Sequence, residues 1–257
     1  MEDYDINVYA FELFKTCPHI VHGIFTRANG TPARSFESLN AGADFKHTPS
    51  ADAVNRERII RKTGITALVF LNQVHGDAVK VLKKDDTALT ENFDPGKESY
   101  TADGVITDIK GVALVIQVAD CQSVMLYDPV KKVIANIHSG WRGSVKNIIG
   151  NCLDKMILEF GCRPEHIIAG ISPSLGPCCS EFINYKNEIP KNLWKYKIED
   201  KTYFDFWEMS SDQLMDKGVK KEHIENMEIC TKCHTNLFYS FRGENTVGRF
   251  ACVISMS

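Results

Sequence analysis

The chain lacks both a large excess of charge of one sign and a long apolar run. Its 30 Lys and Arg residues nearly balance its 33 Asp and Glu residues, which leaves a formal net charge of -3. A general nucleic-acid binder presents a strongly basic field, so we expect no nucleic-acid partner. The longest apolar stretch, Gly111 to Ala119, is far too short to cross a bilayer. We therefore expect no membrane partner either.

The N-terminus also lacks the positive leader and apolar segment of a secretory signal. Nine cysteines are present, and this odd number does not suit a disulfide framework, whereas free thiols are usual in a reducing cytosol. Some of them are expected to be plain core residues, and Cys152 and Cys252 are the clearest cases because their surroundings are apolar. These features favour a cytoplasmic protein.

No internal repeat, low-complexity tract or long linker divides the 257 residues. The most polar interruption, at 83–100, is predicted to be a surface loop and not a domain boundary, because residues of chemical interest lie on both sides of it. We therefore expect one catalytic domain over residues 1–257. The sequence does not fix the oligomeric state, and we expect a monomer or a small homo-oligomer.

Strand and helix patterns are both present, without strict alternation between them. Short apolar or β-branched runs predict strands at 20–25, 67–71, 111–119, 123–127, 133–137, 167–170 and 249–254. Periodic segments that are each followed by a glycine predict helices at 51–63, 144–160 and 206–217. The mixture predicts an α+β fold, a single domain with mixed β-sheets flanked by helices.

Three residues that can bind a transition metal follow predicted strands. These are His75, Cys121 and His138, and loops held by a rigid scaffold commonly carry catalytic side chains. Two imidazoles and one thiolate suit a catalytic zinc, which keeps its fourth position open, and copper accepts the same set. The intervals between the three residues match no short metal-binding motif. The residues alone therefore leave a second interpretation open, in which the histidines belong to turns and the cysteine to the core.

The neighbours of these residues add further chemistry. Arg142 offers a fork-shaped donor suited to phosphate or carboxylate, and Trp141 offers a flat apolar face. Gly76, Gly140 and Gly143 permit a close approach of the backbone. This pattern favours a metal ion with an anion bound beside it.

Three segments carry a specific resemblance to a known family: NQVHG at 72–76, VADCQSVMLYDP at 118–129 and IHSGWRGSVKNII at 137–149. Together they resemble the signature of the YfiH family, whose members have been called multicopper polyphenol oxidoreductases, laccase-domain proteins and purine nucleoside phosphorylases. The resemblance continues through 38–59, 170–179 and 230–251, and so covers nearly the whole chain.

The resemblance implies that His75, Cys121 and His138 are the metal ligands. The sequence departs from the family pattern in the C-terminal block, where two adjacent arginines usually precede an acidic residue. Here Arg242 is followed by Gly243 and Glu244. One positive contact to the substrate is therefore expected to be missing.

The resemblance also implies an activity on purine nucleosides. Family members are described as cleaving adenosine, inosine and methylthioadenosine with phosphate, to give the free base and ribose 1-phosphate, and as deaminating adenosine. A zinc ion that lowers the pKa of its water suits deamination, and its open position equally suits phosphate. We expect a purine nucleoside and phosphate as partners and Zn²⁺ as the cofactor, with Cu²⁺ as the alternative.

Four residues are predicted to contact the substrate. Arg142 and Arg242 are expected to neutralise phosphate. Asn40 and Gln73 are expected to hydrogen-bond ribose or base.

The predicted catalytic set consists of the three ligands and Asp120, which stands beside Cys121. A general acid must protonate the departing base, and Asp120 and Asp103 are the candidates. Each has a plainer interpretation, in which Asp103 forms a turn and Asp120 orients a ligand histidine.

Other classes of function remain open. A multicopper polyphenol oxidase would need many paired histidines, but the chain has eight His and no His-x-His. A hydrolase with Cys121 as nucleophile and a histidine as base is the second alternative, and editing of a peptidoglycan precursor is a related one. A non-enzymatic metal-binding protein is disfavoured, because a storage site needs no Arg142 beside it.

The motif Cys230-Thr-Lys-Cys233-His234 has the form of a c-type haem attachment site, half a zinc site or a redox pair. Haem attachment of this type belongs to exported proteins. A zinc site would need a second pair of ligands, and none is obvious, because the adjacent Cys178 and Cys179 are poorly placed to chelate one ion. We expect a turn that carries unremarkable thiols.

Overall fold

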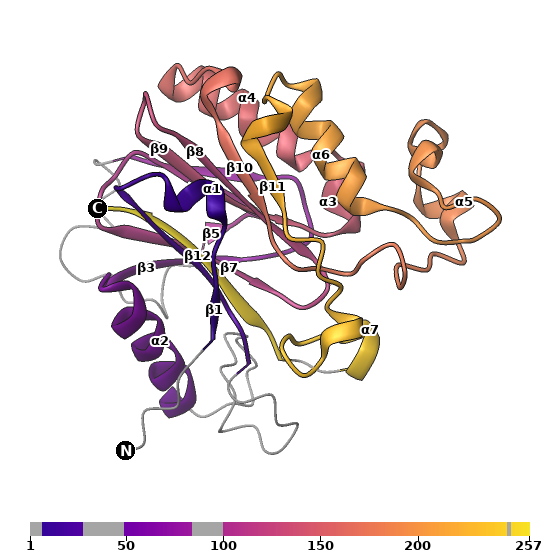
Figure 1. Cartoon of the computed structure of the whole chain (residues 1–257), viewed down its shortest axis with the longest axis horizontal. Coiled ribbons are helices and arrows are strands. Elements are labelled where there is room, and N and C mark those ends of the chain that lie inside the picture. Colours follow the sequence, from indigo (N-terminus) through magenta and orange to yellow (C-terminus); the bar gives the residue numbers. More distant parts are fainter. Residues whose placement is uncertain (1–6, 28–48, 84–99, 246–247) are drawn as a thin grey trace.

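The computed structural model describes residues 7–27, 49–83, 100–245 and 248–257. Two six-stranded sheets stack on each other, with helices on their outer faces (Figure 1). The first sheet has the order β1 (Val8–Tyr9), β2 (Ile20–Phe25), β12 (Phe250–Met256), β7 (Val112–Val118), β3 (Ala67–Asn72) and β5 (Tyr100–Thr101). The second has the order β11 (Ile224–Asn226), β10 (Ile168–Ile171), β8 (Gln122–Asp128), β9 (Val133–Ser139), β6 (Gly104–Thr107) and β4 (Val79–Leu82).

Both sheets combine parallel and antiparallel pairs, which confirms the predicted α+β class with mixed sheets. β3 pairs with β7 and β4 with β6 in parallel, whereas β12 pairs with β7 and β8 with β9 in antiparallel fashion. Every predicted strand coincides with a strand of the structure, apart from small shifts at the ends. All residues of β9 and β12 are buried. Burial on both faces explains why these segments show little alternation of polar and apolar residues.

The helix predicted at 144–160 is interrupted, which corrects that prediction. The chain forms α3 (Trp141–Val145) and α4 (Ile148–Phe160), and Asn147 between them has a φ of 56°. Asn tolerates this left-handed conformation better than most residues, and its side chain caps α4 by accepting the Gly150 N–H at 3.1 Å. The other two predicted helices form as α2 (Pro49–Thr63) and α6 (Phe206–Asp216).

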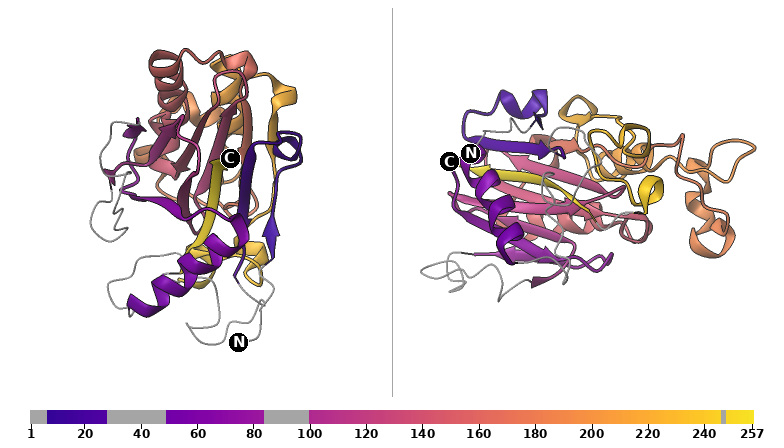
Figure 2. Two further views of the ribbon diagram at one scale, coloured as in Figure 1. Left: turned by 90° about the vertical axis from the view of Figure 1, so that its left-hand side faces the viewer. Right: turned by 90° about the horizontal axis from the view of Figure 1, so that it is seen from below.

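Helices α4 and α2 cover opposite faces of the stack. Ile149 and Leu153 of α4 pack on the outer face of the second sheet, and Ile59 of α2 packs on the outer face of the first. The layers therefore follow the order helix, sheet, sheet, helix (Figures 1 and 2). The largest apolar cluster fills the space between the two sheets.

A buried amide joins the two sheets across this apolar layer. Asn136 of β9 donates to the carbonyls of Leu114 and Cys252 in the opposite sheet, at 3.0 and 2.9 Å, and accepts from the Ser123 hydroxyl at 2.7 Å. A buried polar group is costly unless its hydrogen bonds are made, so one alignment of the sheets is strongly favoured. This alignment determines how the strand ends of the two sheets meet.

The remaining segments surround the stack. α5 (Tyr185–Glu188) and a 3-10 helix at Lys191–Tyr196 belong to a segment that projects from the sheets in Figure 1 and in the right-hand view of Figure 2. It contains an aromatic cluster of its own that includes Phe182, Phe204 and Phe206. α1 (Glu12–Lys15), α7 (Phe241–Glu244) and 3-10 turns at Pro164–His166, Lys221–His223 and Lys232–His234 complete the described elements.

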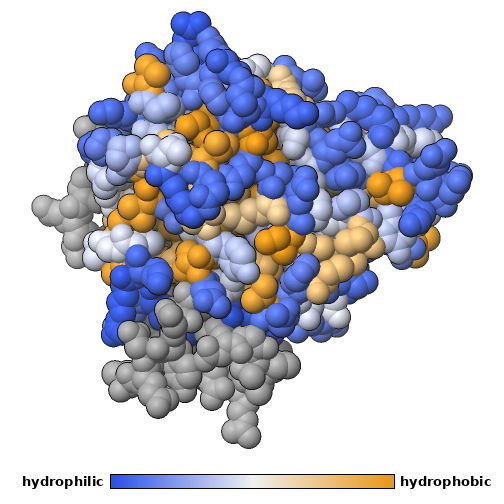
Figure 3. Space-filling model, in the orientation of Figure 1, coloured by the Kyte–Doolittle hydropathy of each residue, from blue (hydrophilic) through white to orange (hydrophobic). Residues whose placement is uncertain are grey.

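The face of the molecule drawn in Figure 3 is largely hydrophilic, and its apolar patches are separated by polar side chains. Within the described ranges, no helix is both long enough and apolar enough to cross a membrane. The loop predicted at 83–100 falls almost wholly outside the described residues.

A half-buried histidine, His22, accepts a hydrogen bond where the chain enters α1. The Phe11 N–H donates to Nε2 of His22 at 2.9 Å, and the rings of Phe11 and Phe14 pack on the imidazole. Burial lowers the pKa of His22 from 6.5 to about 4. The folded state therefore favours neutral His22, whose unprotonated Nε2 is the acceptor.

We expect the stability contributed by neutral His22 to be complete above pH 6.5 and to be lost as the pH falls toward 4, because the unfolded chain takes up the proton first. The loss is on the order of 1 to 3 kcal/mol. Urea unfolding at several pH values would measure it. In His22→Gln, whose amide still accepts the hydrogen bond, this part of the pH dependence should disappear. An unchanged pH dependence in that variant would contradict the assignment.

Candidate metal centre

The structure brings together the three donors that the sequence singles out. The ligand atoms of His75, Cys121 and His138 all lie within 4.8 Å of one another. The two imidazole rings meet edge to face, with centroids 4.8 Å apart. His75 is exposed, Cys121 is half-buried and His138 is buried, so the group is open on one side.

The three donors come from different parts of the two sheets. His75 lies in the turn after β3 and has a φ of 57°, and Cys121 lies in the short link between β7 and β8. Asp120, in the same link, has a φ of 82°. His138 belongs to β9 itself, which corrects the expectation that it follows the strand. The left-handed conformations of His75 and Asp120 are unfavourable for residues other than glycine, so surrounding contacts must stabilise them.

Asp103 holds two of the donors in place. This fully buried carboxylate accepts from Nδ1 of His138 at 2.7 Å. It also accepts the backbone N–H groups of Val74, His75 and Gly76, at 3.3, 2.9 and 2.6 Å. Since Asp103 occupies Nδ1 of His138, Nε2 is the ring nitrogen left for a metal. This is the carboxylate–histidine arrangement that orients ligands in many metal sites.

The charges of the site are coupled. Burial would raise the pKa of Cys121, but His138 and His75 beside it lower that pKa to about 6. Burial would lower the pKa of His138, yet the Cys121 thiolate and the Asp103 carboxylate raise it to about 9. Without a metal, the site thus favours a thiolate next to an imidazolium. A dication can take the place of that proton, and a donor set of one soft sulfur and two imidazole nitrogens fits zinc with one open position.

Gly140, where the chain enters α3, closes one side of the donor group. A Cβ atom at this position would lie 2.9 Å from the Cys121 sulfur and 3.1 Å from Cδ2 of His75. Real Cβ contacts are not so short, so only glycine lets the backbone approach here. The requirement explains the glycine before Trp141 and Arg142.

Asp120 contacts the C-terminal part of the chain and not a histidine. Its carboxylate accepts from the Thr231 and Ser240 hydroxyls, both at 2.7 Å, and from the Arg242 N–H at 2.6 Å. The orienting role that the sequence offered to Asp120 belongs to Asp103. Asp120 instead ties the turn that carries Cys121 to the segment after β11.

The predicted substrate contacts differ in their surroundings. Arg142 is exposed and lies over the Trp141 ring, 4.5 Å from its centroid, and no acidic group in the described part of the chain pairs with it. Arg242 donates to the Glu181 carbonyl at 2.8 Å. Both polar atoms of the Gln73 side chain bond the backbone of Gln117, at 2.9 Å each, so this amide extends the β3–β7 pairing. Asn40 lies outside the described residues.

The acidic residue of the C-terminal block, Glu244, is engaged within the chain. Glu244 pairs with the buried Arg27 at 2.9 Å. That guanidinium also donates to the Thr235 carbonyl at 2.7 Å and lies over the Tyr239 ring at 4.4 Å. The carboxylate of Glu244 is thus neutralised within the chain.

Sequence reasoning considered and rejected one further group of potential ligands. The sulfurs of Cys178, Cys179, Cys230 and Cys233 also lie within 4.8 Å of one another. The expectations of unremarkable thiols and of poor placement for Cys178 and Cys179 therefore need correction. The signal was the presence of two cysteine pairs, but nothing in the sequence indicated that they meet. His234 is not part of this group, since its Nδ1 contacts the Cys230 carbonyl at 2.9 Å.

Comparisons with known proteins agree with the resemblance found in the sequence. The chain is 31% identical over 252 residues to a protein of Bacillus subtilis named purine nucleoside phosphorylase YlmD, covering 92% of this chain and 88% of the relative. A crystal structure of the Bacillus licheniformis hypothetical protein YfiH superposes with a TM-score of 0.84 at 25% identity, covering 97% of this chain and 96% of that one. The structure of YlmD from Geobacillus stearothermophilus gives a TM-score of 0.83 at 25% identity, with 100% and 97% covered.

These neighbours share the α+β fold, and the Bacillus licheniformis protein carries the YfiH name of the family that the sequence motifs resemble. A family profile described as "Multi-copper polyphenol oxidoreductase laccase" matches residues 21–257, which include all three candidate ligands. The chain therefore belongs to the multi-copper polyphenol oxidoreductase laccase family, whose curated relatives here carry purine nucleoside phosphorylase names.

Proposed function

We propose that this chain is a zinc-dependent purine nucleoside phosphorylase, which converts adenosine, inosine or methylthioadenosine and phosphate into the free base and ribose 1-phosphate, and which also deaminates adenosine. The observation that carries the proposal is the open group of His75, Cys121 and His138 with Arg142 nearby in sequence. The name of the Bacillus subtilis relative supports the reaction class. We further propose that residues 1–257 act as one catalytic domain in the reducing cytoplasm, which suits nine free thiols.

His75, Cys121 and His138 would hold the ion, which would supply Lewis-acid activation of phosphate or water. Asp103 keeps His138 in one orientation and fixes the turn of His75. Arg142 has the planar donor geometry to bind phosphate oxygens, and Trp141 beside it offers an apolar surface to a base.

In phosphorolysis, a phosphate oxygen forms a bond to the ribose C1′ while the bond from C1′ to the base nitrogen breaks, and the base leaves with a proton. Asp103 is a poor proton donor because, despite its burial, hydrogen bonds from His138 and Gly76 lower its pKa. Asp120, beside Cys121, is the carboxylate that the sequence predicted to be catalytic. The three hydrogen bonds that it accepts favour a positioning role over proton donation.

A second candidate function rests on Cys121 itself. A thiol whose pKa lies near 6 next to His138 also suits a cysteine nucleophile, as in a hydrolase that edits a peptidoglycan precursor. A copper-dependent polyphenol oxidase has less support. Of the two groups of potential ligands in the described residues, one consists only of cysteines and the other has only two histidines. Copper remains an alternative occupant of the site formed by His75, Cys121 and His138.

The direct test is incubation of the full chain with adenosine and inorganic phosphate, before and after removal of metal, with products identified by chromatography. We expect free base and ribose 1-phosphate, together with some inosine, and we expect chelation or His138→Ala to reduce turnover to background. His166→Ala is the matched control, because His166 lies beyond the opposite end of β8 and β10. Zinc-loaded protein without nucleoside turnover would contradict the proposal. Hydrolysis that survives chelation but not Cys121→Ser would favour the cysteine hydrolase.

Arg142→Gln should lower kcat/KM for phosphate by about 10- to 100-fold, because a hydrogen bond to a charged group contributes about 1.5 to 3 kcal/mol. Arg142→Lys should recover only part of this, since an ammonium group lacks the planar fork. Steady-state kinetics with phosphate as the varied substrate would measure both. Arg61→Gln, an exposed change on α2, should behave as the unmodified chain. Equal effects on reactions with and without phosphate would argue against phosphate binding by Arg142.

Asp103→Asn should weaken zinc binding by about 10- to 100-fold, since loss of an orienting carboxylate has effects of this size. Competition with a chromophoric chelator would give the dissociation constants. The control is Asp77→Asn, because Asp77 is exposed, lies close to His75 in sequence and pairs only with exposed Lys146 among the described residues. Equal affinities of the two variants would refute the orienting role.

A further inference from the structure

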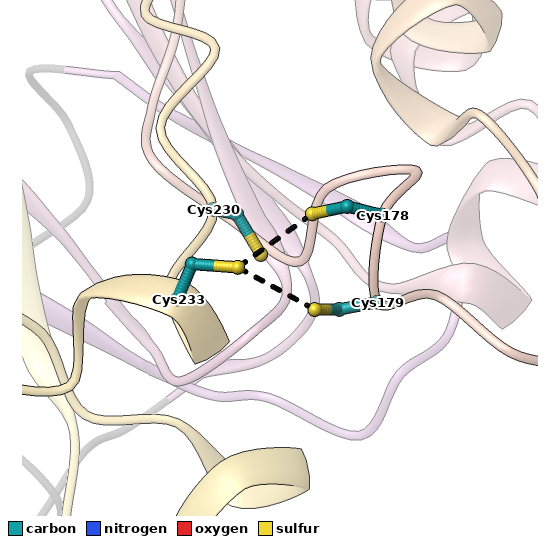
Figure 4. A group of neighbouring side chains, drawn as sticks. All are labelled: Cys178, Cys179, Cys230 and Cys233. Carbon is teal, nitrogen blue, oxygen red and sulfur yellow. Dashed lines mark hydrogen bonds between the residues drawn. The ribbon is translucent and has the colours of Figure 1, made fainter.

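Four thiols converge at a place that the proposed reaction does not use. Cys178 and Cys179 lie in the turn after β10, and Cys230 and Cys233 lie in the segment after β11. The sulfur of Cys233 is 3.7 Å from that of Cys178 and 3.6 Å from that of Cys179. Figure 4 shows both adjacent cysteines directing their sulfurs toward the other pair.

The spacing of the sulfurs matches a tetrahedral tetrathiolate. Zinc–sulfur bonds of about 2.3 Å in a tetrahedron place neighbouring sulfurs about 3.8 Å apart. The two distances to Cys233 are close to this value, and all four sulfurs lie within 4.8 Å of one another. The turn at 176–179, closed by a hydrogen bond from the Cys179 N–H to the Gly176 carbonyl at 2.9 Å, lets two adjacent residues face the same point.

Backbone N–H groups stabilise a thiolate at the centre of the cluster. The Gly176 N–H donates to the Cys230 sulfur at 3.3 Å. The Cys233 N–H also donates to this sulfur. A Cys-x-x-Cys loop whose own N–H returns to its first sulfur is preorganised for a metal, because the ligand must be deprotonated to bind.

The two segments are joined independently of the sulfurs. The Ser174 N–H donates to the Ile229 carbonyl at 3.1 Å, and the Thr231 N–H donates to the Ser174 carbonyl at 3.0 Å. Gly176 suits this approach, because a Cβ atom there would lie 2.7 Å from Cη2 of Trp207 and 3.1 Å from Cβ of Cys230. The four sulfurs are thus held near one another by backbone contacts on both sides.

We propose that Cys178, Cys179, Cys230 and Cys233 bind one zinc ion as a structural site, separate from the group of His75, Cys121 and His138. Binding releases the remaining thiol protons and forms four Zn–S bonds with no change of oxidation state. The ion clamps the turn after β10 to the segment after β11. Thr231, inside the Cys-x-x-Cys loop, donates to Asp120 at 2.7 Å, so the clamp also supports the turn that carries Cys121.

The zinc content of the full chain, purified under reducing conditions and dialysed after zinc loading, tests this proposal. We expect two zinc ions per chain, falling to one in Cys233→Ser and to one in His138→Ala. Cys17→Ser, at a half-buried cysteine outside both groups, should keep two. Zinc content in Cys233→Ser equal to that of the unmodified chain would overturn the proposal.

Cobalt gives a second readout that does not depend on catalysis. In His138→Ala loaded with Co²⁺, we expect intense thiolate-to-metal absorption and the visible bands of tetrahedral cobalt. Both should be lost when Cys233→Ser is added. The absence of these bands from His138→Ala would count against the site, whatever the nucleoside assays give.

Alkylation of the unmodified chain covers the case in which a variant does not fold. Mass spectrometry should find the four cysteines protected in the zinc-loaded protein and modified after chelation, with no change at Cys17. Free thiols can also be counted by titration in denaturant without reductant. A count below nine, together with one zinc ion per chain, would identify a disulfide in this cluster and overturn the zinc assignment.

Discussion

A buried carboxylate connects the two sheets at the edge where the candidate site lies. Asp103 stands between β5 of the first sheet and β6 of the second, and its own N–H and carbonyl bond Ala78 and His138. A buried charge is tolerated only where hydrogen bonds replace water, and here three backbone N–H groups and an imidazole do so. The arrangement that stabilises this charge is also the arrangement that orients His75 and His138. The site and the junction of the sheets are therefore one structure.

The rest of the site depends on this junction in different degrees. His138 is part of a buried strand, and Cys121 lies in a short link between two central strands, so both are placed by the most rigid elements. Arg142 and Arg242 are exposed residues of the short helices α3 and α7. The geometry of the donor group is thus set by the core, whereas the charged groups around it are set by local contacts such as those of Asp120.

Much of the fold could be predicted from the sequence, because strands buried on both faces carry few polar residues. The interruption at Asn147 could not be predicted, because it depends on a residue in the left-handed conformation inside a segment of helical periodicity. The three donors were identified through strand ends and resemblance. The role of Asp103 in orienting His138 was not identified, because an Ala-Asp-Gly turn does not indicate which strand its carboxylate faces. For the same reason, the engagement of Gln73 with β7 and the meeting of the two cysteine pairs depended on contacts between distant segments.

The lengths of the outermost strands have a consequence for the behaviour of the chain at high concentration. In the described part of the structure, the two sheets end in β1 and β5, of two residues each, and in β11 and β4, of three and four residues. An exposed edge with many free N–H and C=O groups is a template on which another chain can add a strand, and short edge strands limit that addition. The long apolar strands β7, β8, β9 and β12 all lie inside the sheets. The strand order thus keeps the segments most prone to aggregation away from the edges.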